Sequence, residues 1–282
     1  MRCPACGGFL PDGTSCCPYC GSPVFAVKSS PKVGGGAGLN VVASPKAGEG
    51  IRLNCMPSPE AVALEKENGG ADVFDNCIDG ILELICEGKN NTRWFGSGFI
   101  VTQDGYAVTN AHVAANEEDG SPVKNGKITV KVCNSYVRAK VIALADDKAG
   151  RGNGIDLAVI KLDQMPSGSK ALQIEDYSTV RNGEQIYVIG NSLGEGTCIT
   201  SGIVSDKNHK GHLMFDCPSN GGNSGGPIIN SEGKVIGVLW GGRLVPAKGG
   251  SDNMVMVGAE GMNFAVPSNI LLEFLKKTIN YK

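Results

Sequence analysis

Apolar and polar residues alternate along most of the chain after residue 70. The segments 127–132 (Lys-Ile-Thr-Val-Lys-Val) and 137–141 (Val-Arg-Ala-Lys-Val) both repeat with a period of two. This period puts one row of side chains on each face of a strand, so both segments predict strands with one buried face. About six such strands lie between residues 80 and 162, and about six more lie between 171 and 266. We therefore expect an all-β fold of two antiparallel six-stranded barrels.

Turn residues and one helical pattern mark the ends of these elements. Asp104-Gly105 and Glu232-Gly233 are typical of tight hairpins. Residues 267–279 predict a closing helix, with lysines near its negative end and apolar residues at helical spacing. Those apolar residues are Ile270, Leu271, Phe274 and Leu275.

Composition divides the chain of 282 residues into three parts. Residues 1–23 are rich in cysteine. Residues 24–70 are rich in Gly, Ser and Pro and predict a flexible linker, with a short helix from Ser58 to about Asn68. Residues 71–282 hold the strands, with barrel one at about 72–165 and barrel two at about 170–266.

The first part contains two Cys-x-x-Cys-Gly knuckles. Their spacing fits a tetrahedral zinc site, and about twenty residues without a core need a metal to fold. The segment resembles the short zinc ribbons of many microbial proteins, and a disulfide-stapled leader is the alternative. The expected ligands of a structural Zn(II) are Cys3, Cys6, Cys17 and Cys20.

Charge and hydropathy exclude several classes of partner. The chain has 26 basic and 28 acidic residues, and Arg2 and Asp12 are the only charged residues before Pro23. Nucleic acid is not expected, because a phosphate backbone needs clustered Lys and Arg. We expect no membrane span and no secretory leader, because no apolar run is long enough.

The cysteines bear on the cellular compartment. Of the 11 cysteines, six lie beyond the first part: Cys55, Cys77, Cys86, Cys133, Cys198 and Cys217. A chain with no leader and with thiolate ligands fits a reducing cytoplasm, so we expect a cytoplasmic protein. Three disulfides among these six cysteines remain the alternative.

Three separate motifs carry the candidate chemistry. Ser224 lies in the glycine-rich segment 217–227, His112 ends an apolar stretch, and Asp156 precedes the apolar run 157–162. A serine becomes a nucleophile when an imidazole takes its proton, and a carboxylate holds the imidazole in the right tautomer. Asp146 and Asp147 are alternative acids.

The glycines before Ser224 suit an oxyanion hole. The backbone N–H groups of Gly222 and Ser224, with Asn223 shaping the turn, are expected to face the developing negative charge. One such donor is worth about 2.7–4 kcal/mol of barrier.

These motifs together resemble the HtrA/Deg group of trypsin-like serine proteases, over roughly residues 72–280. The matching stretches are 96–101, 105–113, 156–161, 189–191, 202–205, 222–227 and 263–267. The resemblance implies a double β-barrel with His112, Asp156 and Ser224 as a catalytic triad. It also implies a homo-oligomer, often a trimer. We expect no peptide-binding PDZ domain of the group after the protease segment.

The resemblance also locates a specificity pocket. It implies a floor at Pro218 and Ser219 and a wall at Leu239, Trp240 and Gly241. No carboxylate is expected at that floor, so small or medium apolar residues are expected before the scissile bond, although Asp216 lies near.

The sequence leaves two classes of function. The first is a serine endopeptidase that acts on protein or peptide substrates, with protein quality control as its role and no cofactor for catalysis. The second is a chaperone-like module that holds unfolded segments with little turnover. An esterase is a weaker third hypothesis, because the same constellation cleaves other acyl groups.

Overall fold

The computed structural model describes residues 69–88, 92–116, 119–145, 155–248 and 254–281. The predicted zinc ribbon, the linker and the short helix at 58–68 lie outside the described residues, and so do Asp146 and Asp147.

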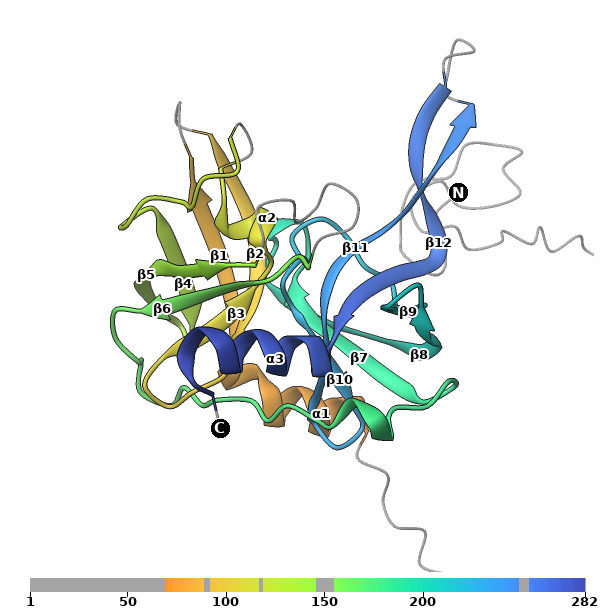
Figure 1. Ribbon diagram of the computed structural model, residues 1–282, viewed down its shortest axis with the longest axis horizontal. Helices are drawn as coiled ribbons and strands as arrows, with labels where there is room; N and C mark the ends of the chain where they lie inside the picture. The colour runs from red at the N-terminus through yellow and green to blue at the C-terminus, as the bar shows by residue number, and fades with distance from the viewer. Residues whose placement is uncertain (1–68, 89–91, 117–118, 146–154, 249–253, 282) are drawn as a thin grey trace, which may run out of the picture. The chain divides into compact units, whose positions relative to one another are not determined.

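Barrel one is a closed antiparallel sheet in the order β1-β2-β3-β6-β5-β4 (Figure 1). Its strands are β1 (Ile81–Glu87), β2 (Arg93–Ile100), β3 (Tyr106–Thr109), β4 (Ile128–Val132), β5 (Ser135–Leu144) and β6 (Ala158–Leu162). In β4 every second residue is buried, as the period of two predicts.

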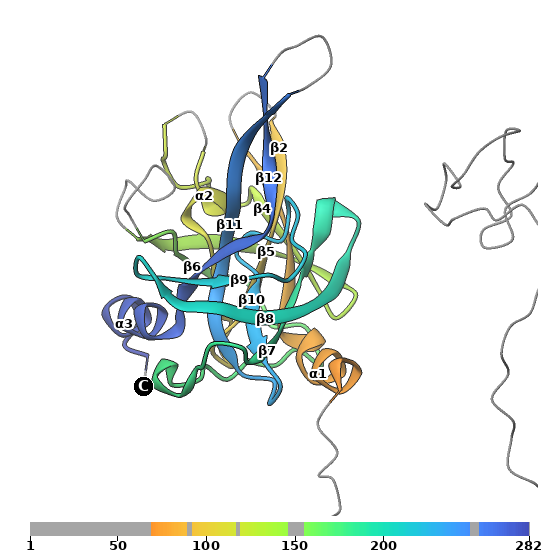
Figure 2. The same cartoon turned by 90° about the vertical axis from the view of Figure 1, so that its right-hand side faces the viewer.

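Barrel two is a second closed sheet, in the order β10-β11-β12-β9-β8-β7. Its strands are β7 (Gln185–Asn191), β8 (Thr197–His209), β9 (His212–Phe215), β10 (Pro227–Asn230), β11 (Val235–Lys248) and β12 (Met254–Pro267). The two views in Figures 1 and 2 show that β11 and β12 run past the rest of this barrel as a two-stranded ribbon.

The apolar residues gather in three clusters. One fills barrel one, with Leu82 and Ile160 among its fully buried members, and one fills barrel two, around Phe215 and Ile186. The third joins the barrels to each other and to both long helices, and it includes Phe99 of barrel one. Full burial of one such side chain stabilises the fold by about 1.5–3 kcal/mol. The two barrels therefore share the third cluster as a common core.

Two helices cover this shared core. The closing helix α3 (Ser268–Ile279) buries Leu271 and Leu275, close to the predicted range. Helix α1 (Gly70–Cys77) precedes β1 and buries Val73 and Cys77. The sequence analysis placed no helix here, because α1 begins at the second glycine of a pair and its N-cap residue, Gly69, has no side chain to signal the helix start.

The two-barrel prediction is confirmed, with six strands in each closed sheet and a helix at the carboxyl end.

Candidate active site

His112 and Asp156 come from neighbouring strands of barrel one. His112 lies in α2 (Ala111–Ala114), which follows β3, and Asp156 lies two residues before β6. Strands β3 and β6 pair antiparallel, with Thr109 opposite Ala158. The chain therefore leaves β3 and enters β6 at the same edge of the barrel, which brings the two side chains together.

The Asp156 carboxylate binds His112 at two points. Its Oδ2 lies 2.5 Å from Nδ1 of the ring, and its Oδ1 accepts the backbone N–H of His112 at 3.1 Å. The Asp156 carbonyl in turn accepts from Nδ2 of Asn110 at 2.7 Å. Because Nδ1 donates to the carboxylate, Nε2 is the ring atom left to accept a proton. The ring is 40% exposed and the carboxylate only 4%.

Ser224 lies in the loop between β9 and β10, and its backbone reaches the first barrel. The Ser224 carbonyl accepts from the Ser97 N–H at 2.8 Å. The next residue, Gly225, packs so closely that a Cβ there would lie 2.9 Å from the Asn110 nitrogen, and Asn110 lies two residues before His112. The structure therefore brings the Ser224 loop against the segment that carries the histidine.

A β-turn comes directly before Ser224. The Asn223 N–H donates to the Asn220 carbonyl at 3.2 Å. Gly222, but not Gly221, has a positive φ, of 92°, which identifies a type II turn. The Gly221 carbonyl accepts from the Leu193 N–H at 2.7 Å. Because a trans peptide points its C=O and N–H in opposite directions, the Gly222 N–H faces away from Leu193.

Two backbone donors are free in this loop. Within the described residues, the N–H groups of Gly222 and Ser224 donate to no protein acceptor. The intervening Asn223 is 2% exposed, and its carbonyl accepts the Gly226 N–H at 2.9 Å. Two nearby N–H groups in a rigid turn can stabilise negative charge on a bound oxygen.

Ser97 connects the two halves of the site. Its Oγ donates to the Gly222 carbonyl at 2.7 Å and accepts the Asn191 N–H at 2.8 Å. Its carbonyl accepts from Oγ1 of Thr109 at 2.7 Å. Ser97 is fully buried, so each of these bonds replaces one to water. The sequence analysis gave Ser97 no role, although a serine between two glycines in an apolar strand is a usable signal.

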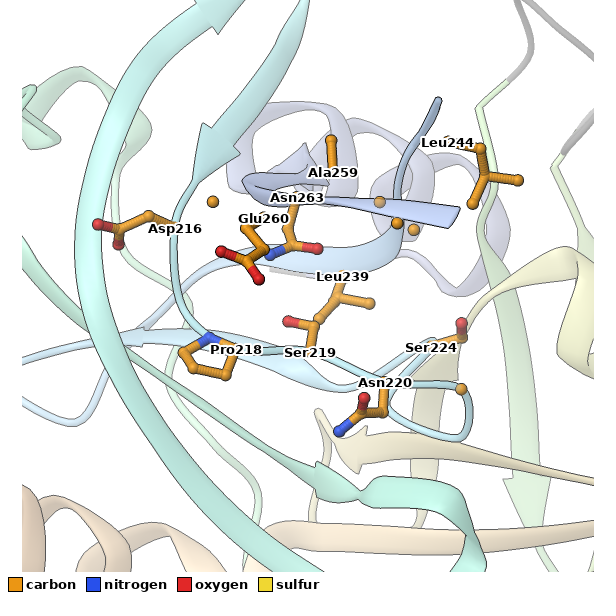
Figure 3. A pocket seen from close by; sticks show the side chains of 15 residues that line it. Asp216, Pro218, Ser219, Asn220, Ser224, Leu239, Leu244, Ala259, Glu260 and Asn263 are labelled. Atoms are coloured by element: carbon orange, nitrogen blue, oxygen red, sulfur yellow. The ribbon is translucent and has the colours of Figure 1, made fainter. Parts of the chain in front are cut away.

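A pocket of about 720 Å³ opens beside Ser224. Pro218, Ser219, Leu239 and Gly241 line it, whereas Trp240 is not among its lining residues (Figure 3). β11 has a bulge between Leu239 and Gly241. A bulge interrupts the strict alternation of a strand and re-aims a side chain, here that of Trp240.

The same pocket holds residues that the sequence analysis missed. Glu260 and Asn263, from β12, line it together with Asp216. The Asp216 Oδ1 accepts the Ile203 N–H at 2.7 Å, and in Figure 3 its carboxylate points away from the other lining side chains. Glu260 is exposed to solvent. No local pattern in the sequence could identify these residues, because β12 reaches the pocket through long-range pairing.

Trp240 belongs to an aromatic cluster and packs against the apolar cluster that joins the barrels. Trp240 stacks on Phe264 at a ring distance of 5.8 Å, and His212 lies 5.4 Å from Trp240. Burial, with a smaller contribution from His209, lowers the pKa of His212 below its ordinary value of 6.5. The Nδ1 of His212 is buried without a partner among the described residues, which also disfavours a second proton on the ring.

Five body cysteines lie in the described part of the chain, and all are free thiols: Cys77, Cys86, Cys133, Cys198 and Cys217. Burial raises the pKa of Cys86 and of Cys217 to about 12, so both are unreactive thiols at neutral pH.

The described residues contain no group of three or more His, Cys, Asp or Glu side chains placed to hold a metal ion. The predicted ligands Cys3, Cys6, Cys17 and Cys20 lie outside that part of the chain. Among the helices of the described segments, none is both long and apolar enough to cross a bilayer.

The sequence family described as a trypsin-like peptidase domain matches residues 96–238, which include His112, Asp156 and Ser224.

Among curated proteins, a serine protease HtrA-like of Staphylococcus aureus is 36% identical over 203 residues, covering 64% of this chain and 23% of that protein. The serine protease HTRA1A of Danio rerio is 32% identical over 194 residues, covering 65% of this chain and 34% of that protein. The chain thus spans about a third or less of the length of these curated relatives.

Solved structures give the same picture. The HtrA-type protease AlgW, solved with a tripeptide, has a TM-score of 0.59 and 25% identity, covering 74% of this chain and 63% of that one. A serine endoprotease from Yersinia pestis has a TM-score of 0.58 at 24% identity, covering 74% and 65% of the two chains, and is similar in fold.

Proposed function

This chain belongs to the trypsin-like peptidase family, and from that premise we propose that it is a serine endopeptidase. Ser224 is the nucleophile, His112 the general base and Asp156 the residue that orients the base. The observation that carries the proposal is the double contact of the Asp156 carboxylate with the ring and the backbone of His112. That contact leaves Nε2 as the ring atom that accepts a proton.

The proposed reaction has two halves. The Ser224 oxygen attacks the peptide carbonyl carbon while Nε2 of His112 takes the hydroxyl proton, and the carbonyl oxygen becomes an oxyanion next to the N–H groups of Gly222 and Ser224. The C–N bond then breaks, the leaving amine takes the proton from His112, and an acyl-enzyme remains. Water activated by the same imidazole hydrolyses the ester and frees Ser224.

The pocket supports a preference for small or medium apolar side chains before the scissile bond. Leu239 and Pro218 are among its lining residues, and Asp216 is already bonded to a backbone N–H. The exposed Glu260 keeps its hydration, so it gives a bound cation little gain. A peptide library with preferred cleavage after Arg or Lys would refute this preference.

The test of the activity combines labelling and proteolysis. We expect a fluorophosphonate probe to label wild type at Ser224 and not to label Ser224→Ala or His112→Ala. We also expect wild type to digest casein and Ser224→Ala not to digest it. Casein digestion that survives in Ser224→Ala contradicts the proposed mechanism. Casein binding without digestion by wild type would favour the chaperone-like alternative.

Further proposals concern the whole chain. Breakdown of unfolded protein in the cytoplasm is the role that we propose, and the free thiols of the body cysteines support a reducing compartment. The spacing of Cys3, Cys6, Cys17 and Cys20 supports one structural zinc ion. The resemblance to the HtrA/Deg group supports a homo-oligomer. Zinc content and sedimentation mass of the full chain test the last two.

A further inference from the structure

The ribbon beyond the pocket has an unusual composition for a surface. In its described part, residues 244–248 pair with 254–258, with Leu244 opposite Gly258 and Lys248 opposite Met254. Lys248, at the outer end, is the one charged residue among these positions. Strand pairs at a surface normally have charges that prevent association, and a two-stranded ribbon alone is marginally stable in water.

The two faces of the ribbon differ. Side chains alternate along a strand, and directly paired residues share a face. Leu244, Pro246, Met254 and Met256 therefore form one face, which we name the methionine face. Val245, Val255 and Val257 lie on the other face, which we name the valine face. On the methionine face, Leu244 is 57% exposed, Met254 61% and Met256 58%.

The methionine face is continuous with the pocket. Leu244 and Gly258, a directly paired couple on that face, line the same pocket as Ser224 (Figure 3). From Leu244 the face continues along β11 for four more residues, to the position that is paired with Met254. At the rise of a strand, four residues span about 13 Å. A polypeptide that is bound in the pocket and extends at least about 13 Å beyond it can contact the whole face.

We propose that the methionine face is an exosite that binds an apolar segment of the substrate polypeptide outside the pocket. This inference rests on the proposed endopeptidase function. Leu244, Pro246, Met254 and Met256 have no charge to select an acidic or basic segment, and Lys248 is paired only at the outer end of the face. Methionine side chains are flexible and polarisable, so they adapt to varied apolar sequences. The occupant is therefore an unfolded chain with exposed apolar residues.

The contact is made through side chains rather than by strand addition. Pro246 lies in β11 and has no N–H. A partner strand added along β11 would lack a donor there. Recognition through a side-chain face tolerates many sequences, which suits a protease for unfolded proteins.

The test compares two pairs of substitutions on the same strand. Met254→Thr with Met256→Thr changes the methionine face, and Val255→Thr with Val257→Thr changes the valine face. Threonine preserves the strand propensity in both. Each full-length variant is assayed on casein and on a chromogenic three-residue apolar peptide, which fills only the pocket.

We expect the methionine pair to raise KM for casein by about tenfold, which corresponds to about 1.4 kcal/mol. Its kcat/KM on the short peptide stays at the wild-type value, and the valine pair stays at the wild-type value on both substrates. Equal effects of the two pairs, or no effect of the methionine pair, overturn the exosite. A lower sedimentation mass of the methionine pair with unchanged KM for casein also overturns it, because the face then binds a second copy of the chain.

A binding measurement separates this inference from the proposed function. Fluorescent casein is titrated into Ser224→Ala chains with each pair of substitutions, and the methionine pair alone is expected to weaken binding by about tenfold. If wild type hydrolyses neither substrate, the endopeptidase proposal fails, whereas the binding measurement still decides whether the face is an exosite.

Discussion

The two barrels contribute to the candidate site in different ways. Barrel one supplies side chains, since a carboxylate and an imidazole face each other across two adjacent strand ends. Barrel two supplies Ser224 and the backbone around it, since a type II turn directs N–H groups and glycines fill positions that other residues cannot occupy. Substitutions in the two barrels should therefore impair the candidate site in different ways. A change at His112 or Asp156 removes a chemical group, whereas a change at the glycines of barrel two alters the shape of the chain.

Asp156→Asn is expected to have the largest effect, because it removes the charge that orients His112. We expect kcat to fall by about 10⁴, since the amide favours the wrong tautomer of the ring. The circular dichroism spectrum should stay at the wild-type value, because the side-chain volume is kept.

The control is Asp163→Asn, an exposed aspartate directly after β6. It should keep full activity on the same peptide. A loss below tenfold in Asp156→Asn would show that barrel one does not supply the orienting charge.

Gly222→Ala tests the contribution of the type II turn in barrel two. A Cβ there would clash with the Asn191 carbonyl oxygen, and the positive φ is strained for alanine. Loss of the Gly222 donor should lower kcat by about 10² to 10³. Unlike the Asp156 variant, this one should also unfold at a lower temperature, because the strain costs about 1–3 kcal/mol.

Gly221→Ala is the matched comparison. A Cβ at Gly221 meets no atom within 4 Å, and its φ is not positive. Its melting temperature should match that of wild type. If the two alanine variants lose activity and stability equally, the turn is not the source of the effect.

Ser97→Ala tests the hydrogen bonds by which Ser97, in barrel one, contacts barrel two. Removal of the hydroxyl leaves the buried Asn191 N–H and the Gly222 carbonyl without this partner. Stability should fall by about 1–3 kcal/mol, and kcat should fall more than KM rises, because the turn loses its support.

Thr109→Val is the control for Ser97. It removes a hydrogen bond to the Ser97 carbonyl but none to the turn. We expect urea denaturation to show a loss of stability while kcat stays close to wild type. Equal kcat losses in both variants would mean that Ser97 acts through general stability alone.

The smallest expected effect is the contribution of His212, in barrel two, to the pH dependence of the free energy of unfolding. Burial lowers the pKa of His212 in the folded chain, so between that pKa and 6.5 the unfolded chain binds more protons. The free energy of unfolding should therefore decrease as the pH falls below 6.5 and be independent of this group above it. His212→Phe should show a shallower decrease between pH 7 and 5 in thermal melts. An unchanged slope would contradict a buried, neutral His212.

The sequence predicted the fold well, because closed barrels leave a period of two in strands such as β4. It also selected His112 and Asp156, which the structure brings into contact. It did not predict that Glu260 lines the pocket or that Trp240 is absent from the lining. Both depend on pairing between distant strands and on a bulge in β11, and neither leaves a periodic signal.

The peptide group between Gly221 and Gly222 is held on one side by Leu193, and Ser97 holds the carbonyl of Gly222. Both supports are internal to the chain, so the turn that would form the proposed anion site keeps its shape without a bound substrate. Peptide boronates, which mimic the tetrahedral adduct, should therefore associate in a single kinetic phase. Inhibitors for this fold can then be ranked by simple equilibrium affinity.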